Sequence, residues 1–356
     1  MTAMPETALA ASAASGWSRR AGTLALPALP VVLAFALAAI VLALAGHDPV
    51  DVYGQLLTEA FGSRQRIAST LAASTPLILS GLAIAVAFRA GAFNVGVEGC
   101  IYVGGLAAAF AGFTFTGLGP ALLPVALVTG IATGALWMLL PGLLRARLGV
   151  DEVVTTLMLN FIAISLTSYL VNGPLLAPGA ANSATPMIAD AARLPRLFSG
   201  INLNAGFAIA LALVVLYWLW GRWTAIGFET RLAGLNARFA RATGLDVPML
   251  IIRMMLMSGA IGGLAGAVHA LGNVHRFVAG FSPGYGFTGI AVALLGRGNA
   301  LGILLAAILF GALATSGATI QLFTDVPVEI VNILQGMVMI FAVARFGLLF
   351  ARRKAS

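Results

Sequence analysis

Residues 90–105 read AGAFNVGVEGCIYVGG, and they interrupt a stretch that is otherwise apolar enough to enter a membrane. The segment holds five glycines, together with Asn94 and Glu98. Inside a bilayer, a non-helical backbone is tolerated only where neighbouring protein or a hydrated cavity satisfies its polar groups. The segment therefore predicts a broken helix within a bundle of membrane-spanning helices.

A second interrupted segment covers residues 280–296, GFSPGYGFTGIAVALLG. Its apolar part, from about Phe287 to Leu295, is too short to cross a bilayer as a regular helix. Pairs of short or glycine-rich segments are typical of the broken helices at transport sites. We expect the two segments to run in opposite directions, which fits an inverted repeat, although their sequences share little similarity.

The composition places the rest of the chain in the same class. Of 356 residues, 60% are apolar and only 9% are charged, against roughly 25% charged in a soluble domain. The mean hydropathy is +1.00, and the apolar runs are continuous rather than alternating as in a membrane barrel. At about 20 residues for each crossing, the length allows roughly ten helices. The sequence predicts an all-α polytopic membrane protein.

The apolar runs define the expected spans and the organisation of the chain. The first run is too long for the core of a signal peptide and lacks a convincing cleavage site, so we expect it to remain as a span. Around the transmembrane domain, 21–348, we expect a cytoplasmic N-terminal tail, 1–20, and a basic cytoplasmic tail, 349–356. The ten predicted spans are 22–45, 67–88, 91–113, 120–142, 153–172, 205–221, 249–272, 286–296, 300–322 and 327–344.

The distribution of charge predicts the orientation of these spans. With the N-terminus inside, fifteen basic residues fall in cytoplasmic segments and five in external ones. An excess of arginine and lysine marks cytoplasmic loops, so both termini are expected in the cytoplasm. The net charge of +8 is therefore explained by membrane topology, and no nucleic-acid partner is expected.

Several kinds of chemistry are excluded by residues that the chain lacks. The single lysine, Lys354, is near the C-terminus, so no G-x-x-x-x-G-K-[ST] phosphate-binding loop is present. The single cysteine, Cys100, cannot form an internal disulfide, and three histidines offer little for a metal site. We expect no catalytic residues, no metal and no cofactor in this chain. If ATP drives its activity, a separate chain hydrolyses it.

Three polar residues inside predicted spans are candidates for a substrate pathway: Asn94, Glu98 and Asn160. A carboxylate within the membrane is costly unless it is paired or hydrated, so Glu98 is a functional candidate. The structural alternative is that its oxygens accept hydrogen bonds from backbone N–H groups freed by the glycines, or that it pairs with Arg89. Asn160 can equally hold two helices together. Both interpretations stay open for these residues.

The longest internal loop contains residues 226–248, IGFETRLAGLNARFARATGLDVP. It predicts a short basic helix over residues 229–241, with Gly244 as the helix stop, followed by Asp246 as the cap of the next span and Pro248 at its start. One interpretation places this helix on the membrane surface. The other makes it the docking element for a cytoplasmic motor, which the missing phosphate-binding loop favours.

Five strings in this sequence resemble one known family. The chain is similar, from about residue 20 to 345, to the permease subunits of bacterial ABC importers for nucleosides and simple sugars. The order and the spacing of the strings match the family as well. They are FRAGAFNVGVEG (88–99), DEVVTTLMLNFIA (151–163), GFETRLAGLNARFARATGLDV (227–247), LMSGAIGGLAGA (256–267) and GFTGIAVALLGRGNALG (286–302).

The resemblance implies partners and a fold. It implies the ten-helix transmembrane domain of ribose and branched-chain amino acid importers, in the bacterial inner membrane. It also implies a second homologous permease, a substrate-binding lipoprotein, and a cytoplasmic ATPase, commonly with two cassettes, that carries ATP and Mg. Carried over to loop 223–248, it implies that the ATPase-coupling residues are Glu229, Arg231, Gly234, Asn236, Arg238, Arg241 and Gly244.

The sequence thus predicts the permease of an ATP-driven importer for nucleosides, working by alternating access. A simple sugar of the ribose or galactose type is the alternative cargo. An ion-coupled secondary transporter would need more than the single carboxylate at Glu98 within its spans. Cys100 stands where the family usually has glutamine, which removes one amide from the expected pathway.

Overall fold

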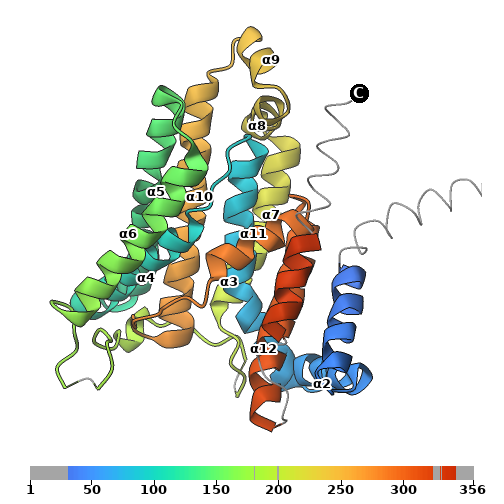
Figure 1. The fold of residues 1–356 in the computed structure, drawn as a ribbon. Helices are drawn as coiled ribbons and strands as arrows, with labels where there is room; N and C mark the ends of the chain where they lie inside the picture. The colour runs from blue at the N-terminus through green and yellow to red at the C-terminus, as the bar shows by residue number, and fades with distance from the viewer. Residues whose placement is uncertain (1–30, 180, 199, 324–328, 330, 342–356) are drawn as a thin grey trace, which may run out of the picture. The chain divides into compact units, whose positions relative to one another are not determined.

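The computed structural model describes residues 31–179, 181–198, 200–323, 329 and 331–341. Within these residues the regular structure is helical, with two isolated β-bridges, as expected for an all-α membrane protein (Figure 1). The predicted tails 1–20 and 349–356 lie outside the described residues. The chain divides into two compact units, 1–53 with 325–356, and 54–324.

The first unit contains the helix Val31–Leu44 and, further along the chain, the helix Val331–Phe341. Tyr53 belongs to α2 (Pro49–Phe61) and donates a hydrogen bond to the Phe35 carbonyl at 2.6 Å. Its ring centroid lies 5.3 Å from that of Phe35. Helix α2 was not predicted, because Pro49–Phe61 is too short and too polar to resemble a span.

The second unit forms the main helical bundle. Counting both units, the described residues contain seven helices long and apolar enough to span a membrane and three shorter apolar ones, which fits the ten predicted spans. The helices of the main bundle are α3 (Arg64–Arg89), α4 (Val97–Thr114), α5 (Leu122–Leu148), α6 (Glu152–Asn172), α7 (Ala205–Trp223), α10 (Val247–His269), α11 (Tyr285–Leu295) and α12 (Ala300–Phe323).

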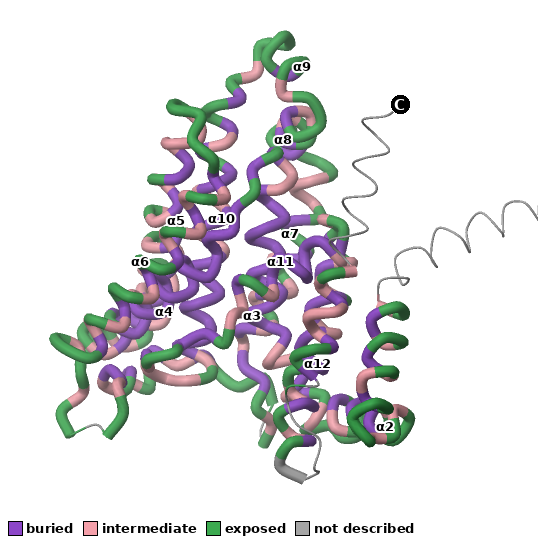
Figure 2. Tube along the Cα trace, in the orientation of Figure 1, coloured by how far each residue is buried: buried purple, intermediate pink, exposed green. Residues whose placement is uncertain are grey.

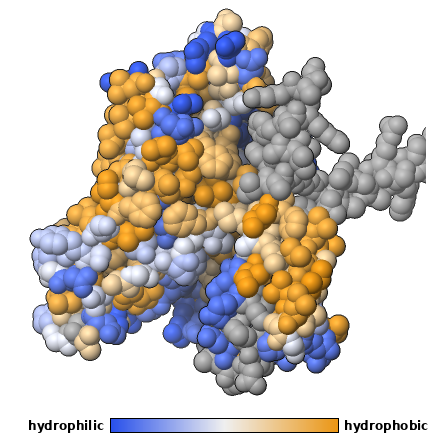
Figure 3. Space-filling model, viewed as in Figure 1, coloured by the Kyte–Doolittle hydropathy of each residue, from blue (hydrophilic) through white to orange (hydrophobic). Residues whose placement is uncertain are grey.

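The helices differ in how far they are buried. In α3 and α4, 78% of the spanning residues are buried, against 28% in α6 and 22% in α7. Figure 2 shows this as a buried centre along α3, α4 and α10, with exposed outer faces on α5 and α6. The exposed side of the bundle is largely hydrophobic, whereas hydrophilic residues gather at its ends (Figure 3). The outer helices therefore present apolar side chains to lipid.

Glycines let α4, α5 and α10 cross closely. A Cβ atom at Gly104 would lie 2.5 Å from the Cα of Gly263, and one at Gly134 would lie 2.7 Å from the same atom. Gly259 and Gly266 are equally enclosed by backbone of the facing helices. The small-residue spacing on α10 thus serves helix packing, as in other membrane bundles.

The helix boundaries around the internal loop follow the predicted signals. Gly244 has φ +89°, a left-handed conformation that glycine adopts without strain, and it follows the end of the short helix α9 (Ala237–Ala242). The Asp246 carboxylate then accepts a hydrogen bond from Met249 N at 3.0 Å and caps α10, with Pro248 in its first turn. These three predictions are confirmed.

The two ends of the main bundle carry different connections. Helices α8 (Ala225–Leu235) and α9 lie at one end, above the ends of α3 and α7 in Figure 1. At the other end, loop 173–204 pairs with the segment after α10 through the bridge Ala184–Val278. Between α10 and that segment, residues Ala270–Val274 form a π-helical turn. Each end therefore has its own candidate site.

Candidate functional site

Two interrupted helices begin next to each other in the centre of the bundle. Helix α3 ends at Arg89, the chain is non-helical to Gly96, and α4 begins at Val97. In the second interruption, the chain leaves the π-helical turn and becomes helical again only at Tyr285, the first residue of α11. Both breaks predicted from the glycine-rich segments are confirmed, and the first is confined to residues 90–96.

Glu98 joins the starts of these two helices. It lies in the first turn of α4 and is 2% exposed. Its Oε2 accepts a hydrogen bond at 2.6 Å from the backbone N–H of Gly286, in the first turn of α11. Helix N-termini carry free N–H groups and a partial positive charge, so a carboxylate between two of them stabilises both. Arg89, the other partner considered for Glu98, donates instead to the Gly221 carbonyl.

One polar face of α6 holds the non-helical segment in place. Glu152, Thr156 and Asn160 are spaced four residues apart, so they lie along one face of the helix. Their side chains accept hydrogen bonds from the backbone N–H groups of Phe93 at 3.1 Å, Val95 at 3.2 Å and Gly99 at 2.8 Å, in that order. The face thus replaces the hydrogen bonds that a continuous helix would make.

The amide groups of Asn160 and Asn94 complete this network. Asn160 Nδ2 donates to the Val95 carbonyl at 2.9 Å. Asn94 Nδ2 donates to Ser258 Oγ at 2.8 Å, and Ser258 in turn donates to the Ala83 carbonyl at 2.6 Å. Both asparagines and Ser258 are fully buried. The structure therefore brings Asn94, Glu98 and Asn160 into one region, where each is bonded to backbone or to a neighbouring helix.

Sequence reasoning missed three members of this network, Glu152, Thr156 and Ser258. The four-residue spacing from Glu152 to Asn160 was a usable signal, because it places all three side chains on one face. No such signal was available for the hydrogen bond between Asn94 and Ser258, because these residues are 164 positions apart in the chain.

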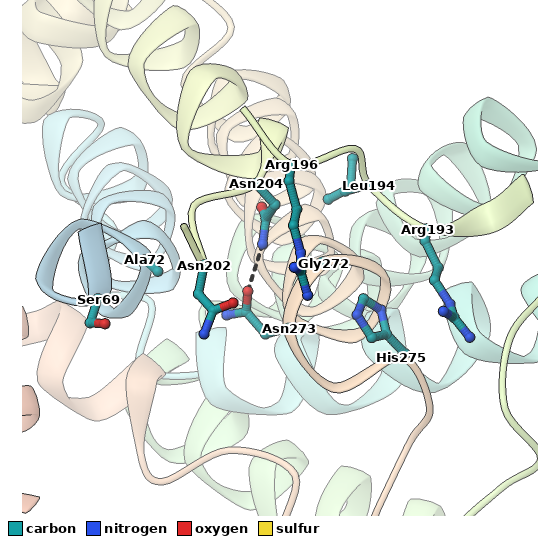
Figure 4. Close-up of a pocket in the computed structure, with 10 residues that line it drawn as sticks. All are labelled: Ser69, Ala72, Arg193, Leu194, Arg196, Asn202, Asn204, Gly272, Asn273 and His275. Atoms are coloured by element: carbon teal, nitrogen blue, oxygen red, sulfur yellow. Dashed lines mark hydrogen bonds between the residues drawn. The ribbon is translucent and has the colours of Figure 1, made fainter. Parts of the chain in front are cut away.

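A polar cavity of about 580 Å³ opens at the end of the bundle formed by loop 173–204 (Figure 4). Its charged and polar residues come from α3, from the loop before α7 and from the turn after α10. Figure 4 shows the Arg196, Asn202 and Asn204 side chains gathered around Asn273. The polar lining residues are Ser69, Arg193, Arg196, Asn202, Asn204, Asn273 and His275.

Hydrogen bonds between distant segments shape this polar cavity. Asn204 caps α7 by accepting from Gly206 N at 2.9 Å, and its Nδ2 donates to Asn273 Oδ1 at 2.7 Å. Gly272 permits this approach, because a Cβ there would lie 2.6 Å from the Asn204 amide nitrogen. The lining offers amide, hydroxyl and guanidinium groups, which suit a ligand rich in hydroxyl and carbonyl groups.

His275 is the titratable group of the polar cavity closest to neutral pH. Partial burial, followed by the positive charges of Arg193 and Arg196, lowers its pKa below the ordinary value. The hydrogen bond between the imidazole and the Leu271 carbonyl, at 3.2 Å, raises the pKa of His275, and Asp190, which forms an ion pair with Arg193 at 3.0 Å, raises it more weakly. The imidazole is therefore neutral at pH 7 and can donate or accept hydrogen bonds.

The prediction of one helix over residues 229–241 was wrong, because the internal loop forms two short helices, α8 and α9, separated by the extended backbone of Asn236. Asn236 joins them and caps α9, because its Oδ1 accepts from Arg238 N at 3.1 Å and Phe239 N at 3.0 Å. Arg238 and Arg241 are exposed on α9, whereas Glu229 on α8 is half-buried. Phe239 is 54% exposed beside these arginines. The loop thus presents basic and apolar side chains together, as a docking surface would.

The internal loop also touches the first helix break. A Cβ at Gly234, in α8, would lie 3.1 Å from the backbone nitrogen of Gly91 and would overlap the Arg89 carbonyl oxygen. Gly91 itself has φ +78° and is the second residue of the non-helical segment. The backbones of α8 and of the segment that holds Asn94 are therefore in direct contact.

Comparisons with known proteins agree with this architecture. A family model described as "Branched-chain amino acid transport system / permease component" matches residues 66–343. The chain is 36% identical to the guanosine ABC transporter permease protein NupP of Bacillus subtilis, covering 94% of this chain and 97% of that one.

Two further relatives cover similar lengths. The glucose ABC transporter permease protein TsgB13 of Haloferax volcanii is 34% identical, over 92% of this chain and 90% of its own. The nucleoside ABC transporter permease protein NupB of Lactococcus lactis is 33% identical, over 90% of both chains. No solved structure matches the chain.

Proposed function

The chain belongs to the permease components of the branched-chain amino acid transport type, within the ABC transporter permeases, and on this premise we propose that it imports nucleosides. It is a multi-pass membrane protein and a transport component, not an enzyme. An ABC ATPase and a substrate-binding protein are its partners in such a system. We further propose that the ATPase carries two nucleotide-binding cassettes and that a second, homologous permease is also a partner of this chain.

The cargo proposal rests on similarity to relatives whose names state nucleosides. The permeases for guanosine and for nucleosides are 36% and 33% identical to this chain over at least 90% of its length. A glucose permease at 34% identity makes a simple sugar the second candidate. Nucleosides and sugars both carry hydroxyl groups, for which the amides and guanidinium groups of the polar cavity are suitable partners.

We propose that the ATPase acts on the path through α8 and α9. ATP and Mg are bound by the partner, and this chain supplies no group to their chemistry. The proposed docking residues are Glu229, Arg231, Gly234, Asn236, Arg238, Arg241 and Gly244. Movement of α8 displaces the backbone at Gly91, and with it residues 93–99. In the proposed cycle this opens a path past Asn94, Glu98 and Asn160, which are enclosed in the conformation described.

The polar cavity is the proposed external mouth of this path. It lies at the end of the main bundle away from α8 and α9, as Figure 1 shows for loop 173–204 and the internal loop. Its polar groups are partly open to solvent, so they can exchange water for the hydroxyl groups of an arriving solute. Contacts of this kind are weak enough to allow release, which a transport path requires.

Uptake by the complete importer in proteoliposomes tests the cargo proposal. Radiolabelled guanosine and glucose are offered separately with ATP inside the vesicles, and each labelled solute is challenged with excess unlabelled ribose, galactose and adenosine. Guanosine uptake that adenosine suppresses, and sugars do not, is the expected result. Concentrative glucose uptake without guanosine uptake would replace the nucleoside proposal with the sugar one.

A further inference from the structure

A second cavity, of about 440 Å³, lies beneath α8 where the ends of α3 and α7 meet the turn between α11 and α12. Three of its lining residues are arginines from three different helices: Arg89, Arg222 and Arg231. We call this site the basic cavity. Arg222 and Arg231 are exposed, so their charged groups are accessible from outside the bundle.

The positive charge of the basic cavity is not neutralised by the described residues. The ion pairs found among them join Arg66 to Glu59, Arg145 to Glu152, and Arg193 to Asp190, and none involves the basic cavity. Several guanidinium groups that lack a carboxylate partner and surround one cavity attract an anion strongly. A bound anion would therefore supply the countercharge that this part of the protein lacks.

The position of the Arg89 side chain favours binding of an anion. Its NH2 group donates to the Gly221 carbonyl at 2.5 Å, and its guanidinium carbon lies 5.4 Å from the centre of the Trp220 ring. Its Nε atom is shielded from solvent and has no hydrogen-bond partner among the described residues. A shielded donor without a partner is costly, and an anion that reaches it would remove this cost.

The surroundings of the basic cavity indicate a lipid. Trp218 lines it and is 48% exposed, while Phe228 on α8 lines it and is 66% exposed. Trp223, at the end of α7, is 74% exposed. Exposed aromatic residues near arginines, at the end of a lipid-facing helix, are typical of the level of the phospholipid headgroups.

We propose that the basic cavity binds the phosphodiester headgroup of an anionic phospholipid. Arginine guanidinium groups match phosphate oxygens in two-pronged hydrogen bonds, and basic pockets between helices hold anionic headgroups in other membrane proteins. The acyl chains then lie along the exposed apolar side of α7. A carboxylate of the ATPase is the alternative occupant, which the aromatic, lipid-facing surroundings disfavour.

The position of the basic cavity gives the lipid a role in coupling. Arg231 and Phe228 belong to α8, whose Gly234 contacts the first helix break. A headgroup held between Arg231 on α8 and Arg222 on α7 ties α8 to the bundle. This consequence rests on the proposed function of α8, whereas lipid binding itself does not.

Lipid retention by the purified full-length chain tests the proposal. The chain in detergent is mixed with phosphatidylglycerol and phosphatidylcholine in equal amounts, and the bound lipids are counted by native mass spectrometry. The double variant R222Q/R231Q removes two charges at exposed positions. The matched control, R147Q, removes one exposed arginine at the end of α5, outside the basic cavity. R222K/R231K keeps the charge.

The expected result is a preference for phosphatidylglycerol in the wild type and in R147Q. The preference falls about fivefold for each cavity charge removed, and the lysine variant recovers most of it. Glycerol phosphate added in excess does not displace the lipid, because it lacks acyl chains. Displacement by glycerol phosphate would identify a site for free phosphate instead.

Equal preference for phosphatidylglycerol in wild type and R222Q/R231Q would overturn the proposal. A second purification, of the complete importer, tests the alternative occupant. Unchanged lipid preference in R222Q/R231Q together with loss of the ATPase from the complete importer would assign the basic cavity to the ATPase, for which Arg231 is already a proposed docking residue.

Discussion

Gly234 of α8 lies with its backbone against that of Gly91, where α3 gives way to the non-helical segment. No side chain separates the internal loop from the first helix break at this point. Residues 93–99 are held by α6 and carry Asn94 and Glu98. We propose that a movement of α8 reaches the centre of the bundle through this contact.

Gly234→Val is expected to uncouple the importer. A side chain at this position would overlap the Arg89 carbonyl, and overpacking of this kind typically costs about 1–3 kcal/mol. ATP-driven uptake should fall about tenfold or more, while the amount of permease in the membrane changes little. Gly54→Ala is the control, because a Cβ there meets no atom within 4 Å. Normal uptake by Gly234→Val would show that close contact at this point is not required.

The exposed arginines of α9 are expected to dock the ATPase. Replacing Arg238 and Arg241 together by alanine should lower uptake and transport-stimulated ATP hydrolysis about tenfold, equivalent to about 1.4 kcal/mol of lost interaction. Insertion should be unaffected, since both side chains are exposed. Arg147→Ala, at the same end of the bundle, serves as the control. Unchanged uptake in the double variant would remove α9 from the docking surface.

Glu98→Gln separates a structural role from contact with cargo. Glutamine keeps an acceptor for the Gly286 N–H but loses the negative charge between two helix N-termini, so we expect a loss of about 1–2 kcal/mol in stability. Thermal unfolding in detergent measures it, with Glu229→Gln as the control. A lower Tm with an unchanged KM for uptake would assign Glu98 to the fold. A changed KM at unchanged Tm would assign it to the path.

His275 predicts how stability depends on pH. Because burial and two arginines lower the pKa of His275 in the folded state, the unfolded chain binds the proton more readily. Its contribution to stability is therefore complete above its unfolded pKa, about 6.5, and is lost as the pH falls below that value. His275→Gln should reduce the fall in Tm between pH 7.5 and 5.5 relative to the wild type. An identical pH dependence in wild type and His275→Gln would contradict this assignment.

The fold was predictable from the sequence to the extent that it depends on local pattern. Long apolar runs define spans because every backbone group in lipid must be satisfied within its own segment. The first break was predicted from the glycines and the second from the short apolar run before Gly296. Helix α2 was missed, because a short helix of mixed polarity produces no comparable signal.

The candidate sites were predictable only in part. The internal loop was recognised from contiguous residues, and its caps at Asn236 and Asp246 are local. The polar cavity was not predicted, because it requires Asn204 to meet Asn273, 69 residues later in the chain. The basic cavity likewise joins Arg89 to Gly221, 132 residues away. Contacts between residues so far apart along the chain produce no recognisable pattern in a single sequence.

We propose that this chain forms a path for the solute and relies on a separate ATPase to drive transport. The most direct test is solute accumulation in lipid vesicles that contain the permease, its proposed partner permease and the binding protein, with and without the ATPase. We expect concentrative uptake only when the ATPase and internal ATP are both present. Accumulation against a gradient in vesicles without any ATPase would show that the permease does not depend on a separate motor.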